Sequence, residues 1–313
     1  MRWLAAEVFK LKRMRVTWVL LLIVVAFEAL MMAGMAYWAQ RSPDAEDMAA
    51  EERELAVKAT SFPASIPFTL SFVASFGPLF AVIIAARLAG DEYAWGTAKQ
   101  QVSMGVDRRR YVAAKLAGAA VASLLLLVGA VLAGAAISLV VTIALGRPVE
   151  TGTLTPPFLV EVARGAGIAW FTLALYSVLT VCAATLTRSA AAATATGILV
   201  LLLEASLVGS LATRFATIAR IAPYTIGHNV NVLLALIEHG AAAGARAAQA
   251  AAEAVPAGQA AQAGQAAQAA AQAQASTLPS GTVVRAFAVL GGWLAAFAAC
   301  SLWTFGRQEL GEE

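Results

Sequence analysis

Long apolar runs, separated by short polar segments, extend through almost the whole 313-residue chain. A helix that crosses a bilayer needs about 20 mostly apolar residues, and six runs meet this requirement. The first run is much longer than the apolar part of a cleaved signal peptide, so we expect it to be a retained span. The pattern therefore predicts an all-α integral membrane protein with six transmembrane helices.

The chain divides into these six spans and the polar segments that connect them. The predicted segments are a cytoplasmic amphipathic helix at the membrane interface (1–15), span 1 (16–39), an external acidic loop or helix (40–65), span 2 (66–87), a cytoplasmic segment with a short helix (88–110), span 3 (111–145), an external loop (146–158), span 4 (159–187), span 5 (189–213), a large external region (214–282), span 6 (283–306) and a cytoplasmic tail (307–313).

The distribution of Lys and Arg predicts how these spans are oriented, because basic residues concentrate in cytoplasmic segments. Basic side chains are frequent in residues 1–16 and in residues 87–115, whereas acidic side chains dominate between spans 1 and 2. We therefore expect both termini to be cytoplasmic. The acidic stretch 44–58 has the composition of a short external helix.

The external region between spans 5 and 6 contains two different kinds of sequence. Its first part includes an apolar stretch, Val230 to Ile237, which is too short to span and suits a re-entrant or interfacial helix. Residues 241–280 form a low-complexity Ala/Gln tract. Ala and Gln favour helix, but Pro256, Gly258 and Gly264 interrupt it, so we expect a mobile helical insertion or a disordered tract.

Composition supports a membrane protein and excludes several other classes. Hydrophobic residues make up 60% of the chain and charged residues 13%, whereas about a quarter of an ordinary soluble domain is charged. A net charge of +3 gives no reason to expect nucleic-acid binding. The two cysteines and two histidines suggest neither a disulfide framework nor a metal site.

Motifs for catalysis are absent from the sequence. There is no Gly-Lys pair and so no phosphate-binding loop of the G-x-x-x-x-G-K-[ST] type, and neither H-E-x-x-H nor G-x-S-x-G occurs. We therefore expect no enzyme activity and no cofactor in this chain. Active transport would take its energy from a partner chain or an ion gradient.

Two carboxylates, Glu28 in span 1 and Glu204 in span 5, are placed inside the predicted membrane. Such residues are energetically costly and usually face a cavity or a partner group. Both are candidates for a substrate path that responds to a cation or a proton. The alternative is a protonated or hydrogen-bonded structural role, which Ser206 and Ser210 favour slightly for Glu204.

The segment between spans 2 and 3 reads GDEYAWGT at residues 90–97 and DRRRYVAAK at residues 107–115. Tyr93 and Trp95 are large rings that usually pack on a surface. Gly96 and Gly105 bracket a stretch long enough for a short helix, and Asp107 suits the N-cap of span 3. We interpret this helix as a docking element for another protein; a solvated connector is the alternative.

These residues resemble the cytoplasmic segment of ABC-2-type exporter permeases. The family tends to show Glu, then Gly-Thr, then a turn, a basic residue and a Lys, and this chain has Glu92, Gly96, Thr97, Arg108 and Lys115 at those places. It departs from the family at residues 106–107, where Pro-x-Ser is common. The opening WLAAEVFKLKRMRVTWVLLL is similar to the family's amphipathic N-terminal helix.

The resemblance implies a multi-pass permease subunit in the bacterial cytoplasmic membrane. Two such chains, as a homodimer or a related heterodimer, would form the path, and two separate ATPase subunits would bind ATP and Mg. The cargo would be lipophilic or amphipathic, such as a drug, an antibiotic peptide or a lipid-like molecule. The residues implied in coupling to the ATPase are Glu92, Tyr93, Trp95, Gly96, Thr97, Gln101 and Arg108, and those of the interfacial helix are Trp3, Lys10, Lys12 and Arg13.

Other readings of the sequence remain open. An ion-driven secondary transporter would use Glu28 or Glu204, although six spans without an obvious internal repeat disfavour it. A non-transporting assembly factor could dock an ATPase through the same short helix. Arg108, Arg109 and Arg110 could pair with acids on the ATPase or with anionic lipid headgroups.

Overall fold

Helices form all the regular structure in the residues that the computed structural model describes, namely 2–41, 56–149, 152, 154–204, 215–237 and 280–308. The elements are α1 (Arg2–Arg13), α2 (Arg15–Arg41), α4 (Ile66–Ala94), α5 (Thr97–Ser103), α6 (Arg108–Ala144), α7 (Pro156–Thr187), α8 (Ala190–Leu203), α10 (Ala216–Ile221), the short 3-10 helix η4 (Ala222–Tyr224), an apolar helix Ile226–Ile237 and α13 (Ser280–Arg307).

Five of the described helices, α2, α4, α6, α7 and α13, are long and apolar enough to cross a membrane. They correspond to predicted spans 1, 2, 3, 4 and 6. Predicted span 5 begins with α8, but residues 205–214 lie outside the described part of the chain. The same holds for most of the predicted external helix 44–58, for the Ala/Gln tract up to residue 279 and for residues 309–313.

The ends of several helices follow from local sequence signals. Asp107 caps α6, its side chain accepting a hydrogen bond from the Arg109 backbone nitrogen at 3.2 Å, as the sequence predicted. Gly96 and Gly105 separate α5 from its neighbours with backbone φ angles of 68° and 83°, a conformation that glycine adopts readily. Both breaks lie where the sequence predicted them, but the helix of predicted span 2 (66–87) continues through residues 88–94 to Ala94.

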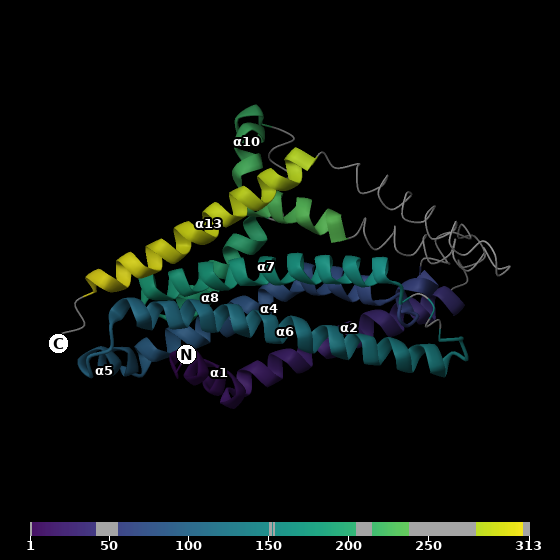
Figure 1. Ribbon diagram of the computed structural model, residues 1–313, viewed down its shortest axis with the longest axis horizontal. Helices are drawn as coiled ribbons and strands as arrows, with labels where there is room; N and C mark the ends of the chain where they lie inside the picture. The colour runs from purple at the N-terminus through teal and green to yellow at the C-terminus, as the bar shows by residue number, and fades with distance from the viewer. Residues whose placement is uncertain are drawn as a thin grey trace.

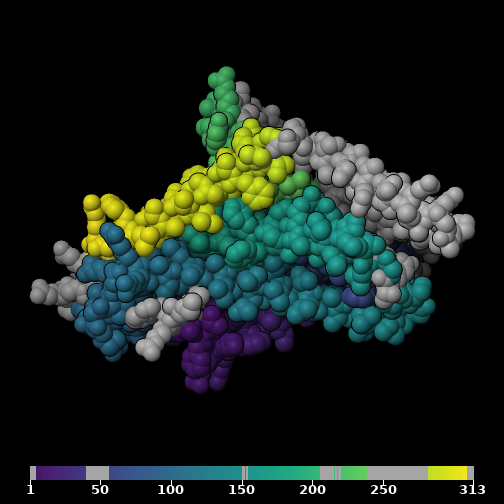
Figure 2. Space-filling model, viewed as in Figure 1, coloured from purple at the N-terminus to yellow at the C-terminus, as the bar shows by residue number. Residues whose placement is uncertain are grey.

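The core lies around α4 and α7, which pack along much of each other's length near the middle of the bundle (Figure 1). α6 packs on both helices, and α2 packs on α6. α13 crosses the bundle obliquely and leaves much of its own surface uncovered (Figure 2). Large apolar side chains such as Leu22, Leu30 and Leu132 are exposed on α2 and α6, as expected for surfaces that face lipid or another membrane chain.

Close contact between α4 and α8 depends on a glycine. A Cβ atom added to Gly90 would overlap the Cα of Ala190 and lie 2.6 Å from its backbone nitrogen. Small residues at such crossings let helix backbones approach closely in membranes. The obstacle here is backbone, which cannot rotate away.

We expect Gly90→Ala to lower the free energy of unfolding by about 1–3 kcal/mol, the usual range for an overpacked core. Gly34→Ala is the control, since nothing lies within 4 Å of a Cβ at that helical position. Both variants can be compared by denaturant titration in detergent. Equal stability of the two would show that α4 and α8 do not approach this closely.

Candidate functional site: a buried charged junction beneath α5

Both ends of the described chain and α5 gather at one end of the bundle (Figure 1). We call this the α5 end, comprising residues 7–13, 88–115 and 303–308. It brings together α1, the last turns of α4, the start of α6 and the last turn of α13. Residues far apart in sequence therefore meet in one buried cluster.

Glu92 is the centre of this cluster. It lies near the end of α4 and is only 5% exposed. Its Oε1 accepts hydrogen bonds from Lys10 Nζ at 2.7 Å and from Lys115 Nζ, and its Oε2 accepts one from the Tyr111 hydroxyl at 2.5 Å. One carboxylate thus connects α1, α4 and α6.

Lys115 completes the cluster by reaching a second carboxylate. It is 2% exposed, and its Nζ also donates to Glu7 Oε1 of α1 at 2.5 Å. Lys10 donates in addition to the Leu88 carbonyl at 3.1 Å. The positive charges of the two lysines therefore balance the negative charges of the two glutamates. A buried cluster needs this balance because an unpaired buried charge is strongly destabilising.

The end of α13 is held at the same place by an aromatic contact. Phe305 is fully buried, and its ring stacks on Tyr111 with centroids 4.8 Å apart and planes 22° apart. Tyr93 meets Phe305 edge-on, with ring centroids 6.5 Å apart. Ala98 of α5 belongs to the same apolar cluster, so the short helix rests directly on this aromatic group.

Hydrogen bonds tie the residues after Phe305 to two other helices. Arg108 Nη1 donates to the carbonyl oxygens of Gly306 at 3.1 Å and Gln308 at 2.9 Å. Gln308 Nε2 donates to the Thr185 carbonyl of α7 at 2.6 Å. The end of α13 is therefore fixed to both α6 and α7.

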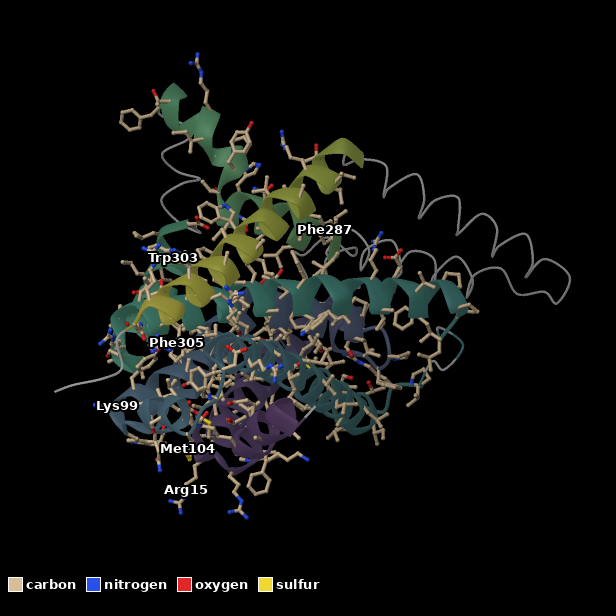
Figure 3. All side chains as sticks on the ribbon, turned by 60° about the vertical axis from the view of Figure 1, so that its left-hand side comes forward. Arg15, Lys99, Met104, Phe287, Trp303 and Phe305 are labelled. Atoms are coloured by element: carbon tan, nitrogen blue, oxygen red, sulfur yellow. The ribbon has the colours of Figure 1, made fainter. Side chains whose placement is uncertain are left out.

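α5 lies over this junction and presents its other face outward. Ala98 is buried, and the Thr97 hydroxyl donates to the Glu92 carbonyl at 3.3 Å. Trp95 and Met104, which flank α5, are each 67% exposed, and Lys99 between them is exposed as well. Figure 3 shows Lys99 and Met104 on the outer side of this end, away from α13. We call Trp95, Lys99 and Met104 the α5 face.

The sequence was also compared with known protein families. The model of the family described as ABC-2 family transporter protein matches residues 3–310. The chain belongs to this family. A search of curated proteins found no match.

Membership in the ABC-2 family makes this chain a permease of an ABC transporter, and permeases of this type work with ABC ATPase subunits. The five long apolar helices in the described part of the chain agree with a multi-pass membrane protein. Among the described residues, no group of three or more His, Cys, Asp or Glu is placed to hold a metal ion.

The residues that the sequence implicated in coupling fall into two groups in the permease. Trp95 is exposed and Gln101 is half-buried on or beside α5, while Gly96 supplies the left-handed turn before it. Glu92, Tyr93 and Arg108 instead make contacts within the chain. Any part that Glu92 plays in coupling must therefore act through its bonds to α1, α5 and α6, because its carboxylate does not reach the α5 face.

The predicted interfacial helix is present as α1, and its basic residues differ in their surroundings. Lys10 points into the junction, whereas Lys12 and Arg13 are exposed, with the Arg13 guanidinium 4.6 Å from the centre of the Phe9 ring. The side chain of Trp3 lies outside the described part. α1 is thus tied to α4 and α6 by its charged residues.

The two membrane carboxylates are in different environments. Glu204, just after α8, accepts hydrogen bonds from the backbone nitrogens of Ile226 at 3.3 Å and Gly227 at 2.5 Å, at the start of the helix Ile226–Ile237. A carboxylate is favourable at a helix N-terminus, so Glu204 has the hydrogen-bonded surroundings of the structural alternative. Glu28 is fully buried between α2, α4 and α6.

Glu7, Tyr111, Phe305 and Gln308 are not among the functional residues expected from the sequence. One signal was available: Glu7 and Lys10 are three residues apart in α1, and Tyr111 and Lys115 are four apart in α6, so each pair shares a helix face. Nothing in the local pattern showed that these two faces meet.

Proposed function

We propose that this permease is the membrane-spanning subunit of an ABC exporter and that α5 is the coupling helix on which a separate ATPase subunit docks. The observation that carries the proposal is the α5 face, an exposed apolar and basic surface seated on a buried charged junction. Large exposed side chains such as Trp95 and Met104 are typical of docking sites. Lys99 adds a positive charge suited to an acidic partner.

The connections below α5 provide a path from the docked partner to the spans. The Thr97 hydroxyl is bonded to the Glu92 backbone, and the Glu92 carboxylate is bonded to α1 and α6. A shift of α5 therefore acts on three helices at once. Such coupling requires that the docked contacts differ in free energy between two states of the permease.

Other parts of the proposal rest on the family resemblance and on composition. The α5 end is cytoplasmic, two permease chains form the path, and ATP and Mg bind to the partner subunits. The protein is placed in the bacterial cytoplasmic membrane. Apolar spans with few charges suit a lipophilic or amphipathic cargo, and the direction of transport follows from the resemblance to exporters.

The double variant Trp95→Ala/Met104→Ala tests the proposal. The permease is isolated from its native membrane in mild detergent. We expect an ATP-binding cassette subunit to copurify with the wild type, detected by mass spectrometry and by its ATPase activity. The variant should retain at most about a tenth of that subunit, because truncating two central interface residues typically costs more than 1.4 kcal/mol of binding.

Trp38→Ala is the control. Trp38 is also exposed, but it lies near the C-terminal end of α2 and not on the α5 face. It should leave the bound ATPase unchanged. Equal amounts of ATPase on wild type and on the double variant would exclude α5 as the docking site. Wild-type permease without any ATPase would contradict the proposed function itself.

A further inference from the structure

Glu28 has an environment that the docking and coupling proposal does not use. It lies near the middle of α2, is 0% exposed, and neither of its carboxyl oxygens has a hydrogen-bond partner. Nearly all buried polar groups in proteins are hydrogen-bonded. A fully buried carboxyl group without a partner therefore calls for an explanation.

The space that Glu28 occupies is created by a missing side chain on α6. A Cβ atom added to Gly134 would overlap Glu28 Oε1 and lie 2.6 Å from Thr69 Oγ1 of α4. The carboxyl group and the hydroxyl thus meet at the same point of α6. Thr69 Oγ1 is also buried without a partner, as is the hydroxyl of Ser65 one turn earlier.

Among the described residues, no basic side chain forms an ion pair with Glu28. The nearest basic residues in sequence are Arg15 and Arg41 on α2, Lys58 and Arg87 on either side of Thr69, and Lys115 and Arg147 on either side of Gly134. Lys115 and Arg147 are engaged elsewhere, at the junction and near Thr60. A lone carboxylate in a membrane interior is strongly unfavourable, so a bound cation would stabilise Glu28 in this position.

A series of buried hydroxyl groups leads from Glu28 toward the end of the bundle opposite α5. Gly134, Ser138 and Thr142 share one face of α6, because they are four residues apart. Ser138 and Thr142 are both 0% exposed. The Thr142 hydroxyl accepts a hydrogen bond from the Phe62 backbone nitrogen at 2.9 Å.

Beyond Thr142 this series reaches Arg147, just after α6. Arg147 Nη1 donates to the hydroxyls of Thr60 and Ser61, each at 3.2 Å. Partial burial lowers the pKa of Arg147 from its ordinary value, and its hydrogen bonds hold the guanidinium at this end. Polar groups therefore lie along the same face of α6 between Gly134 and its end, although the hydroxyls of Ser138 and Thr142 donate to carbonyl oxygens of α6 itself.

We propose that Glu28, Thr69 and Ser65 form a binding site for one small cation, either a proton or a single monovalent metal ion. The cation supplies the charge that α2, α4 and α6 lack, with the carboxyl group as its main ligand and the two hydroxyls as additional oxygens. The site belongs to this chain alone, so it does not depend on ATPase docking.

The test uses the purified permease in detergent without any ATPase. Infrared difference spectra, recorded as a function of pH, detect protonation of a buried carboxyl group. Melting temperatures in sodium chloride, potassium chloride and N-methyl-D-glucamine chloride detect a bound metal ion, because a ligand that binds only the folded state stabilises it. Wild type is compared with Glu28→Gln, which keeps the shape of the side chain but cannot carry the charge.

Either of two results supports the site and identifies its occupant. A carboxyl band that titrates in wild type and is missing in Glu28→Gln indicates a proton. A melting temperature that rises with sodium or potassium in wild type, but not in Glu28→Gln, indicates a metal ion. Glu161→Gln, a partly exposed glutamate paired with Arg164, should behave as wild type in both measurements.

The proposal is overturned if wild type and Glu28→Gln respond identically to pH and to both salts. It is also overturned if the carboxyl band stays constant over the pH range in which the protein remains folded and neither sodium nor potassium raises the melting temperature, since the site would then bind no exchangeable cation. If Glu28→Gln does not fold, Thr69→Val provides the comparison. We expect it to weaken cation binding about tenfold, and an unchanged midpoint would count against the site.

Discussion

Replacing Lys115 by methionine is expected to lower the free energy of unfolding by about 3–5 kcal/mol, the usual effect of removing one member of a buried ion pair. Lys115 is 2% exposed and bonds both Glu7 and Glu92. Methionine fills a similar volume, so the loss comes from the charge. Lys10 still faces Glu92 in this variant, whereas Glu7 loses its partner.

Denaturant titration of the purified permease measures this effect, with Arg110→Met as the control. Arg110 is on the same helix, but its side chain is 77% exposed and its nitrogen is 3.7 Å from Asp107. Exposed ion pairs contribute about 0–1 kcal/mol, so this variant should be close to wild type. If the two variants lose equal stability, the charged junction is not buried.

Adding Glu92→Gln to Lys115→Met should restore part of the lost stability. The first change leaves two carboxylates, Glu7 and Glu92, with one lysine, and the second removes one of these two negative charges. Lys10, which then loses Glu92, has a side chain that is 25% exposed and can be hydrated. The two effects are therefore expected to be non-additive, as is usual for residues in one network. Strict additivity would mean that Lys115 and Glu92 do not interact.

Truncating Phe305 to alanine is the second large expected effect, again about 3–5 kcal/mol. The ring is completely buried, and it stacks on Tyr111 and meets Tyr93 edge-on. Its removal leaves a cavity among α4, α5, α6 and α13. We expect the end of α13 to loosen, with faster hydrogen exchange at the amides of its last turn.

Trp303→Ala is a matched control for Phe305→Ala because it also truncates an aromatic residue of α13. Trp303 is 60% exposed and has Arg307 4.3 Å from the centre of its ring, and Figure 3 shows the two rings on opposite sides of the helix. A cation–π contact at an exposed site contributes about 0.5–1 kcal/mol. If Trp303→Ala lowers the free energy of unfolding as much as Phe305→Ala does, α13 does not pack with Phe305 buried and Trp303 exposed.

These predictions concern the same end of the bundle as the proposed docking site. If stability falls in Lys115→Met while the ATPase stays bound, the junction supports the fold and the α5 face is independent of it. If Trp95→Ala/Met104→Ala releases the ATPase without loss of stability, the two functions of this end are separated. Both outcomes can be read from one set of purified variants.

Much of the helical organisation was predictable from the sequence. Apolar runs of about 20 residues have few alternatives to a membrane helix, because backbone polar groups cannot remain unpaired in lipid. Breaks and caps were also local: Gly96, Gly105 and Asp107 set the limits of α5 and the start of α6, and the predicted short helix, Thr97 to Ser103, was confirmed. Membership in the ABC-2 family, expected from residues 92–115, was confirmed as well.

What the tertiary structure alone decided is which charged residues face one another. The resemblance implies a coupling role for Glu92, and the structure adds that α4 continues past it and turns its carboxylate toward Lys10 and Lys115. Glu28 and Gly134 are 106 positions apart, yet the missing side chain of one makes room for the other. The physical reason is that hydropathy fixes the length of a membrane helix, whereas its rotation and neighbours depend on packing between side chains distant in sequence.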